Sequence, residues 1–174
     1  MGECHKYGYG VKKKLDQAFS YYREAAEQGF PLAQTELGIC YELGQGVAED
    51  WAEAARWYLK AAEQEDEFAQ CNLGFCYYRG IGVEKNYDEA VYWFARAAER
   101  GSPRAQYYLG ECYQYGYGVE LDFKRAAEQY HLVADGGADT AHYILGYYYE
   151  NGWCGVEKDI EEALACYRQA AELG

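Results

Sequence analysis

Four cysteines stand at a fixed spacing and are the first side chains to consider for metal or disulfide chemistry. Cys4, Cys40, Cys76 and Cys112 follow one another at intervals of 36 residues. If this interval is a structural repeat, equivalent residues of neighbouring repeats lie about 8–10 Å apart or more, the spacing of packed helices. That separation is too large for a disulfide or for one tetrahedral zinc site. The spacing therefore predicts buried core cysteines, with no metal ion and no disulfide.

Other side chains that often catalyse reactions do not form a recognisable set. Ser20 and Ser102 are the only serines, and neither lies in a nucleophile motif with histidine and aspartate. His5 and His142 fall where the other 36-residue intervals carry tyrosine and glutamine. The Gly-x-Gly segments lack the lysine and Ser/Thr of a phosphate-binding loop. The sequence thus favours a protein that is not an enzyme and uses no cofactor.

Charge and composition bear on the partners and the location of the chain. The formal net charge is −13 and the basic run at 12–14 is short, so we expect no nucleic-acid partner. No apolar run is long enough for a membrane span or a signal peptide, so we expect no membrane insertion. The seven cysteines are odd in number and include no C-x-x-C pair. They are expected to be reduced, which favours a cytoplasmic location.

The 36-residue interval extends to whole segments of the chain. A Leu-Gly pair recurs at Leu37, Leu73, Leu109 and Leu145, and a Gly-x-Gly-Val segment follows it, with one extra residue in the last copy at 152–156. Such repetition is typical of a solenoid. Because the first repeat is partial and no polar capping helix follows the last, we expect a fragment of a longer protein. The predicted single solenoid domain, 1–174, comprises a partial repeat and four full repeats: 1–30, 31–66, 67–102, 103–138 and 139–174.

Each repeat is predicted to hold two helices. In the first helix, apolar residues recur at i, i+4 and i+8, as at Ala33, Leu37 and Tyr41. In the second, Ala54 and Tyr58 mark the buried edge. The glycines between the helices allow the left-handed conformations that a tight turn needs, so the two helices should be antiparallel. The residues expected to cap the second helices are Asp50, Asn86, Asp122 and Asp159.

These residues resemble the Sel1-like repeat family, whose pattern is A-x-x-x-L-G-x-x-Y-x-x-G-x-G-V-x-x-D followed by A-x-x-x-Y and A-A. The resemblance covers essentially the whole chain, with departures at Lys14, Glu65, Asn86 and Val133. It implies an all-α fold in which antiparallel helix pairs stack into a right-handed α-α superhelix, with the first helices lining the concave side. It also implies an adaptor that binds other proteins.

The resemblance further indicates which side chains face the hollow of the superhelix. Alignment with the related tetratricopeptide motif places positions 32, 35, 39, 42, 43 and their equivalents on that side. These positions are rich in tyrosine, phenylalanine and arginine, and Tyr and Arg dominate binding hot spots. We therefore predict a groove for a peptide or protein partner, although some of these aromatic rings could instead pack between adjacent first helices. The candidate residues are Ile39, Glu42, Phe68, Phe75, Tyr78, Arg79, Arg104, Tyr107, Glu111, Tyr115, Tyr143, Tyr147 and Glu150.

The sequence leaves two alternative functions open and has one irregular loop. Some cysteine-rich relatives bind or hydrolyse β-lactams, but this chain has no Ser-x-x-Lys nucleophile and no clustered metal ligands. The second alternative is an assembly element that self-associates through apolar ends near Tyr21, Tyr22 and Leu164. In the irregular last loop, Trp153 is expected to fold back as a lid on the last helix pair rather than to contact a partner.

Overall fold

The computed structural model describes residues 14–153 and 158–174. The chain divides into two compact units, one ending at Asn86 and one beginning at Tyr87, and each is described by itself. Every regular element in the described ranges is an α-helix, which confirms the all-α prediction. None of these described helices combines the length and the apolar character that a membrane span requires.

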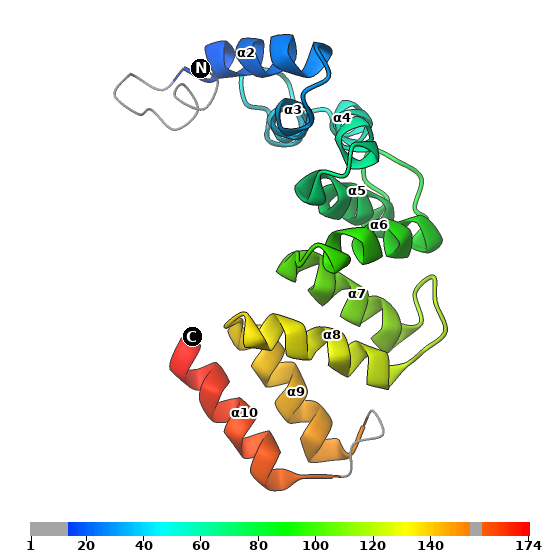
Figure 1. Ribbon diagram of the computed structural model, residues 1–174, viewed down its shortest axis with the longest axis vertical. Coiled ribbons are helices and arrows are strands. Elements are labelled where there is room, and N and C mark those ends of the chain that lie inside the picture. Colours follow the sequence, from blue (N-terminus) through cyan, green and yellow to red (C-terminus); the bar gives the residue numbers. More distant parts are fainter. Residues whose placement is uncertain (1–13, 154–157) are drawn as a thin grey trace. The chain divides into compact units, whose positions relative to one another are not determined.

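In the first unit, each helix packs on the next one along the chain (Figure 1). The pairs α2 with α3, α3 with α4, and α4 with α5 are all in contact. The predicted solenoid arrangement is therefore present within this unit. The helices are α2 (Leu15–Glu27), α3 (Pro31–Leu43), α4 (Trp51–Glu63) and α5 (Glu67–Arg79).

The second unit repeats this arrangement. Contacts join α6 to α7, α7 to α8, α8 to α9 and α9 to α10, and the last two helices lie side by side (orange and red in Figure 1). The handedness of the superhelix stays a prediction. The helices are α6 (Tyr87–Glu99), α7 (Pro103–Tyr115), α8 (Phe123–Asp135), α9 (Asp139–Asn151) and α10 (Ile160–Leu173).

The helices begin and end where the sequence places their caps. The Asp50 carboxylate accepts hydrogen bonds from the backbone nitrogens of Ala52 and Glu53, both at 3.0 Å. Asp122 and Asp159 cap α8 and α10 in the same way. Each first helix whose end is described stops at a glycine in the left-handed conformation. A residue with a Cβ would adopt this conformation only at a cost in free energy. These glycines are Gly44, Gly80, Gly116 and Gly152.

The two apolar stripes form the core of the repeats. Leu37, Leu73, Leu109 and Leu145 are all buried on the first helices. On the second helices, the predicted buried edge is confirmed by residues of α4 that expose none of their surface: Ala54, Tyr58, Ala61 and Ala62. Burial of this alternating set of small and large side chains is what ties each helix to its neighbours.

A tyrosine of the second helix joins the two helices of a repeat in a way that the sequence did not reveal. It is buried at Tyr58 and Tyr130 and half-buried at Tyr167. Its ring lies against the glycine of the Leu-Gly pair. A Cβ atom on this glycine would leave no room for the ring. The ring–glycine pairs are Tyr58 with Gly38, Tyr130 with Gly110, and Tyr167 with Gly146. The hydroxyl groups of these tyrosines donate hydrogen bonds to Glu42, Gln114 and Glu150, respectively.

A glutamine joins consecutive repeats. The Gln34 side-chain Nε2 donates to the Ala26 carbonyl at 3.2 Å, and Gln70 donates to the Ala62 carbonyl at the same distance. Both glutamines are buried, so each of these bonds satisfies a polar group inside the helix stack. In the last repeat, His142 takes this position and is half-buried.

Replacing Glu65 with glycine is expected to stabilise the protein. It has a φ of +67°, whereas Gly29, Gly101 and Gly137 hold the left-handed conformation at the equivalent turns. An L residue pays about 1–2 kcal/mol for this conformation, and the greater freedom of glycine in the unfolded chain offsets part of the gain. We expect Glu65→Gly to raise the free energy of unfolding by about 0.5–1 kcal/mol in urea titrations. An unchanged or lower midpoint would contradict this prediction.

Candidate functional site

The first unit carries six of the predicted groove residues, and none of them is buried. On α3, Ile39 and Glu42 are half-buried, and the Glu42 carboxylate accepts the hydrogen bond from the Tyr58 hydroxyl. On α5, Phe68 leaves 63% of its surface exposed, although it is a large apolar side chain. The other three residues on α5 are Phe75 and Tyr78, which are half-buried, and Arg79, which is exposed.

The second unit carries the other seven, and again none is buried. On α7, Tyr115 exposes 53% of its surface, and on α9 Tyr143 and Tyr147 expose 61% and 42%. Glu150 is exposed and accepts a hydrogen bond of 2.8 Å from the Tyr167 hydroxyl. The remaining residues of this set, all on α7, are exposed Arg104 and half-buried Tyr107 and Glu111.

Two positions assigned to the hollow of the superhelix are buried instead. Thr35 and Cys71 expose only 2% and 3% of their surface. The Thr35 hydroxyl donates at 3.0 Å to the carboxylate of Asp66, which also caps the start of α5. This position therefore lies at the junction of two repeats, and the expectation that it faces the hollow was wrong for these two residues.

Tyr107, which is equivalent to Thr35 and Cys71, combines packing with partial exposure. Its ring lies 5.6 Å from the Tyr108 ring and 5.9 Å from the Tyr130 ring, measured between centroids. Its hydroxyl lies 3.5 Å from a Glu111 carboxylate oxygen. Burial, followed by the charge of Glu111, raises the pKa of the Tyr107 hydroxyl. The ring thus packs in part on α8, the second helix of its own repeat, and packing between adjacent first helices stays a prediction.

Trp153 lies against three aromatic rings of the second unit. The centroid distances are 5.2 Å to Tyr147, 5.6 Å to Phe123 and 6.2 Å to Tyr148. The side chain still exposes 39% of its surface. It has the neighbours that a lid requires, and it also remains accessible from solvent. Cys154, next to it, lies outside the described residues.

The cysteines that the structure describes are core residues, as the spacing predicted. Cys40, Cys76 and Cys112 are buried, and so are Cys71 and Cys166, which do not belong to that spacing. Burial, with a smaller contribution from the charge of Glu111, raises the pKa of the Cys112 thiol to about 12, which keeps it protonated. Within the described ranges, no group of three or more His, Cys, Asp or Glu side chains could hold a metal ion. Cys4 and His5 lie outside those ranges.

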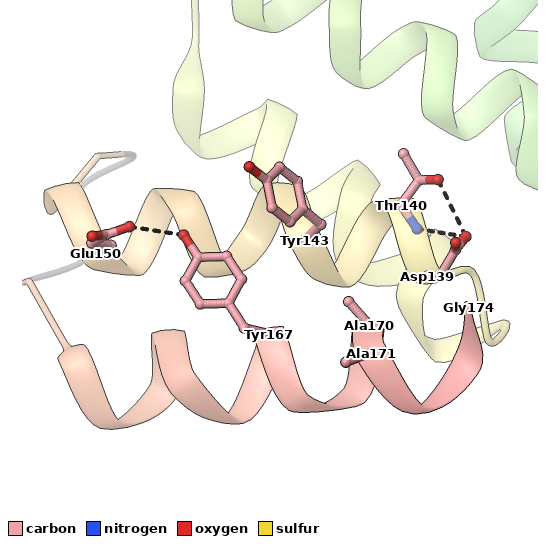
Figure 2. Close-up of a pocket in the computed structure, with 8 residues that line it drawn as sticks. All are labelled: Asp139, Thr140, Tyr143, Glu150, Tyr167, Ala170, Ala171 and Gly174. Carbon is pink, nitrogen blue, oxygen red and sulfur yellow. Dashed lines mark hydrogen bonds between the residues drawn. The ribbon is translucent and has the colours of Figure 1, made fainter.

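A pocket of about 790 Å³ lies on the last helix pair (Figure 2). Tyr143 from α9 and Tyr167 from α10 approach with ring centroids 5.6 Å apart. Burial, followed by the hydrogen bond to Glu150, raises the pKa of the Tyr167 hydroxyl to about 12, so this hydroxyl donates at neutral pH. The sequence placed Tyr143 and Glu150 at a surface, whereas Tyr167 is the equivalent of Tyr58, which the sequence placed on the buried edge. The other lining residues are Asp139, Thr140, Ala170, Ala171 and Gly174.

The chain matches a family model over almost its whole length. The model describes the Sel1 repeat and matches residues 1–30, 31–66, 68–102, 103–137 and 140–174. No curated protein sequence matches the chain.

Solved structures show the same fold. A Sel1 repeat protein from Oxalobacter formigenes is 40% identical, with a TM-score of 0.91, and the match covers 99% of this chain and 71% of that protein. A protective antigen of uropathogenic Escherichia coli strains, displaying an SLR fold, is 36% identical, with a TM-score of 0.92. That match covers 98% of this chain and 36% of the antigen, so the chain spans about a third of its length.

The cysteine-rich protein B of Helicobacter pylori is a more distant match. It is 23% identical, with a TM-score of 0.59, and the match covers 77% of this chain and 96% of that protein. At this identity the likeness extends to the fold alone. The family model and the two more similar structures each match nearly the whole chain, and all three describe Sel1-type repeats. The chain therefore belongs to the Sel1 repeat family.

Proposed function

We propose that this chain is a protein-binding scaffold whose first helices contact a peptide or protein partner through aromatic side chains. The observation that carries the proposal is the exposure of large aromatic residues on these helices. Phe68 exposes 63% of its surface in the first unit, and Tyr115 exposes 53% in the second. An apolar side chain in water gains free energy when a partner covers it, and such side chains in clusters mark interaction sites.

The chemistry of these surfaces suits a protein partner. Tyrosine buries a large area at a small loss of side-chain entropy and keeps a hydroxyl for a hydrogen bond. Arg79 and Arg104 add exposed guanidinium groups, which pair with carboxylates in two parallel hydrogen bonds. In each unit, the first helices thus carry both exposed aromatic side chains and a guanidinium group that can set the orientation of a partner.

Tyr115→Ala is expected to weaken binding, whereas Tyr92→Ala is not. The two tyrosines form a matched pair, because Tyr92 exposes 50% of its surface but lies on α6, a second helix. A partner captured from a lysate of the source organism would be identified by mass spectrometry and then titrated against both variants. We expect Tyr115→Ala and Phe68→Ala each to lower its affinity about tenfold, a typical hot-spot effect. Equal losses for Tyr92→Ala, or no loss in either groove variant, would contradict the groove assignment.

A further inference from the structure

The pocket on α9 and α10 has an apolar floor. Ala170 and Ala171 of α10 line it together with the tilted rings of Tyr143 and Tyr167 (Figure 2). Tyr143 exposes 61% of its surface, more than the other large apolar side chains of α9. A surface of alanine and aromatic carbon that is open to solvent gains free energy when another apolar surface covers it.

The equivalent face inside the second unit shows what covers such a surface. Val133, which corresponds to Ala170, is buried, and it lines a smaller pocket beside Ala138 and Ala141 at the start of the next repeat. Ala141 is completely buried there. Within the repeat array, the partner of this face is therefore the small-residue side of an α-helix. The last helix pair presents the same kind of surface, so a helix with small apolar residues would match it in shape.

The last pocket differs from the internal one in charge. Asp139 takes the place of Pro103, which lines the internal pocket, and Glu150 stands at the repeat position of Gln114, which does not. The two acidic residues lie near opposite ends of α9 (Figure 2), about 16 Å apart along its axis at 1.5 Å per residue. None of the described residues that line the pocket is a lysine or an arginine. The Glu150 carboxylate accepts from the Tyr167 hydroxyl, and the Asp139 carboxylate accepts from Thr140 of its own helix.

We infer that the α9–α10 face binds an amphipathic helix of a partner protein, with small apolar residues on one side and basic residues near both ends. Its apolar side would cover Ala170, Ala171 and Tyr143, and its basic side chains would meet Asp139 and Glu150. The net charge of −13 adds a long-range attraction for such a helix. The inference rests on the proposed function, because it names the partner chemistry for one protein-binding surface.

The test uses the full chain and two synthetic helical peptides. Both are 16-residue, acetylated and amidated fluorescent peptides with an alanine and leucine stripe at i, i+4, i+7 and i+11. One carries lysines near its two ends, and the other carries glutamines there. Fluorescence anisotropy at low salt is expected to show about tenfold tighter binding of the lysine peptide, the combined effect of two exposed ion pairs and long-range attraction.

Matched variants separate this pocket from general attraction to an acidic protein. Glu150→Gln removes a pocket carboxylate, whereas Glu128→Gln removes an exposed carboxylate of α8 that does not line the pocket. We expect Glu150→Gln to weaken lysine-peptide binding about two- to fivefold and Glu128→Gln to leave it within error. Tyr143→Ala should weaken binding as well. Equal effects of the two glutamine variants, or equal affinity for both peptides, would overturn the inference.

Two further outcomes identify a different occupant. If Tyr115→Ala, outside the pocket, weakens the lysine peptide as strongly as Tyr143→Ala does, the peptide binds the first-helix surface and the inference fails. If light scattering shows a dimer that Tyr143→Ala dissociates, a second copy of the chain covers this face, and the inference also fails. Loss of the captured partner's binding in Tyr115→Ala tests the groove separately, so failure of one assignment leaves the other intact.

Discussion

Replacing Gly82 with alanine is expected to lower the free energy of unfolding by about 3 kcal/mol or more, at the upper end of single-residue effects. Gly82 has a φ of +74°, which costs an L residue about 1–2 kcal/mol. An added Cβ would also overlap the Trp51 carbonyl group and lie 2.9 Å from the Ala52 nitrogen. Because these atoms belong to the backbone at the start of α4, they cannot move aside without shifting the helix.

Gly29→Ala is the control that separates the two contributions. Gly29 also has a positive φ, of +93°, but its added Cβ would have no atom within 4 Å. It should therefore lose only the conformational part, about 1–2 kcal/mol. Urea unfolding followed by circular dichroism measures both variants. Similar losses for Gly82→Ala and Gly29→Ala would show that the contact with Trp51 does not constrain the loop.

The sequence predicted the helices well because their signals are local. The stripe through Leu37, the cap at Asp50 and the glycine at Gly44 each act within one or two turns of chain. The second glycine of the three loops that the structure describes in full shows what local signals leave out. The sequence predicted only a turn at this glycine. In the structure, the glycine also lies close to the backbone at the start of the second helix of the preceding repeat, as at Gly46 with Leu15 and Gly118 with Tyr87. Such a contact depends on the stacking of repeats.

The candidate site was predictable only in part for the same reason. The resemblance to the tetratricopeptide motif placed Glu42 and Glu150 at a surface, but it did not show that their carboxylates accept hydrogen bonds from Tyr58 and Tyr167. Nor did it show that Thr35 is covered by the start of the next repeat. Equivalent side chains of different repeats differ in exposure, because different neighbouring residues cover them. A repeated sequence pattern, by contrast, predicts the same environment for every copy.

Gly38→Ala is expected to lower the free energy of unfolding by about 2–3 kcal/mol, because it overpacks the contact between α3 and α4. The added Cβ would lie 2.5 Å from Cε1 and 2.7 Å from Cδ1 of the Tyr58 ring. That ring exposes none of its surface, and its hydroxyl is held by the Glu42 carboxylate. Since Gly38 is helical, with no positive φ, alanine at this position should otherwise favour the helix.

A double-mutant cycle with Tyr58→Leu isolates this contact. Tyr58→Leu alone should be destabilising, because it leaves a cavity and removes the hydrogen bond to Glu42. In the double variant, the smaller leucine leaves room for the new Cβ, so the losses should not add. We expect a coupling free energy of about 1–2 kcal/mol that favours the double variant, measured from urea unfolding midpoints and slopes. Additive losses would mean that Gly38→Ala destabilises the protein by some route other than the Tyr58 ring, and the proposed role of the Leu-Gly pair in seating that tyrosine would have to be abandoned.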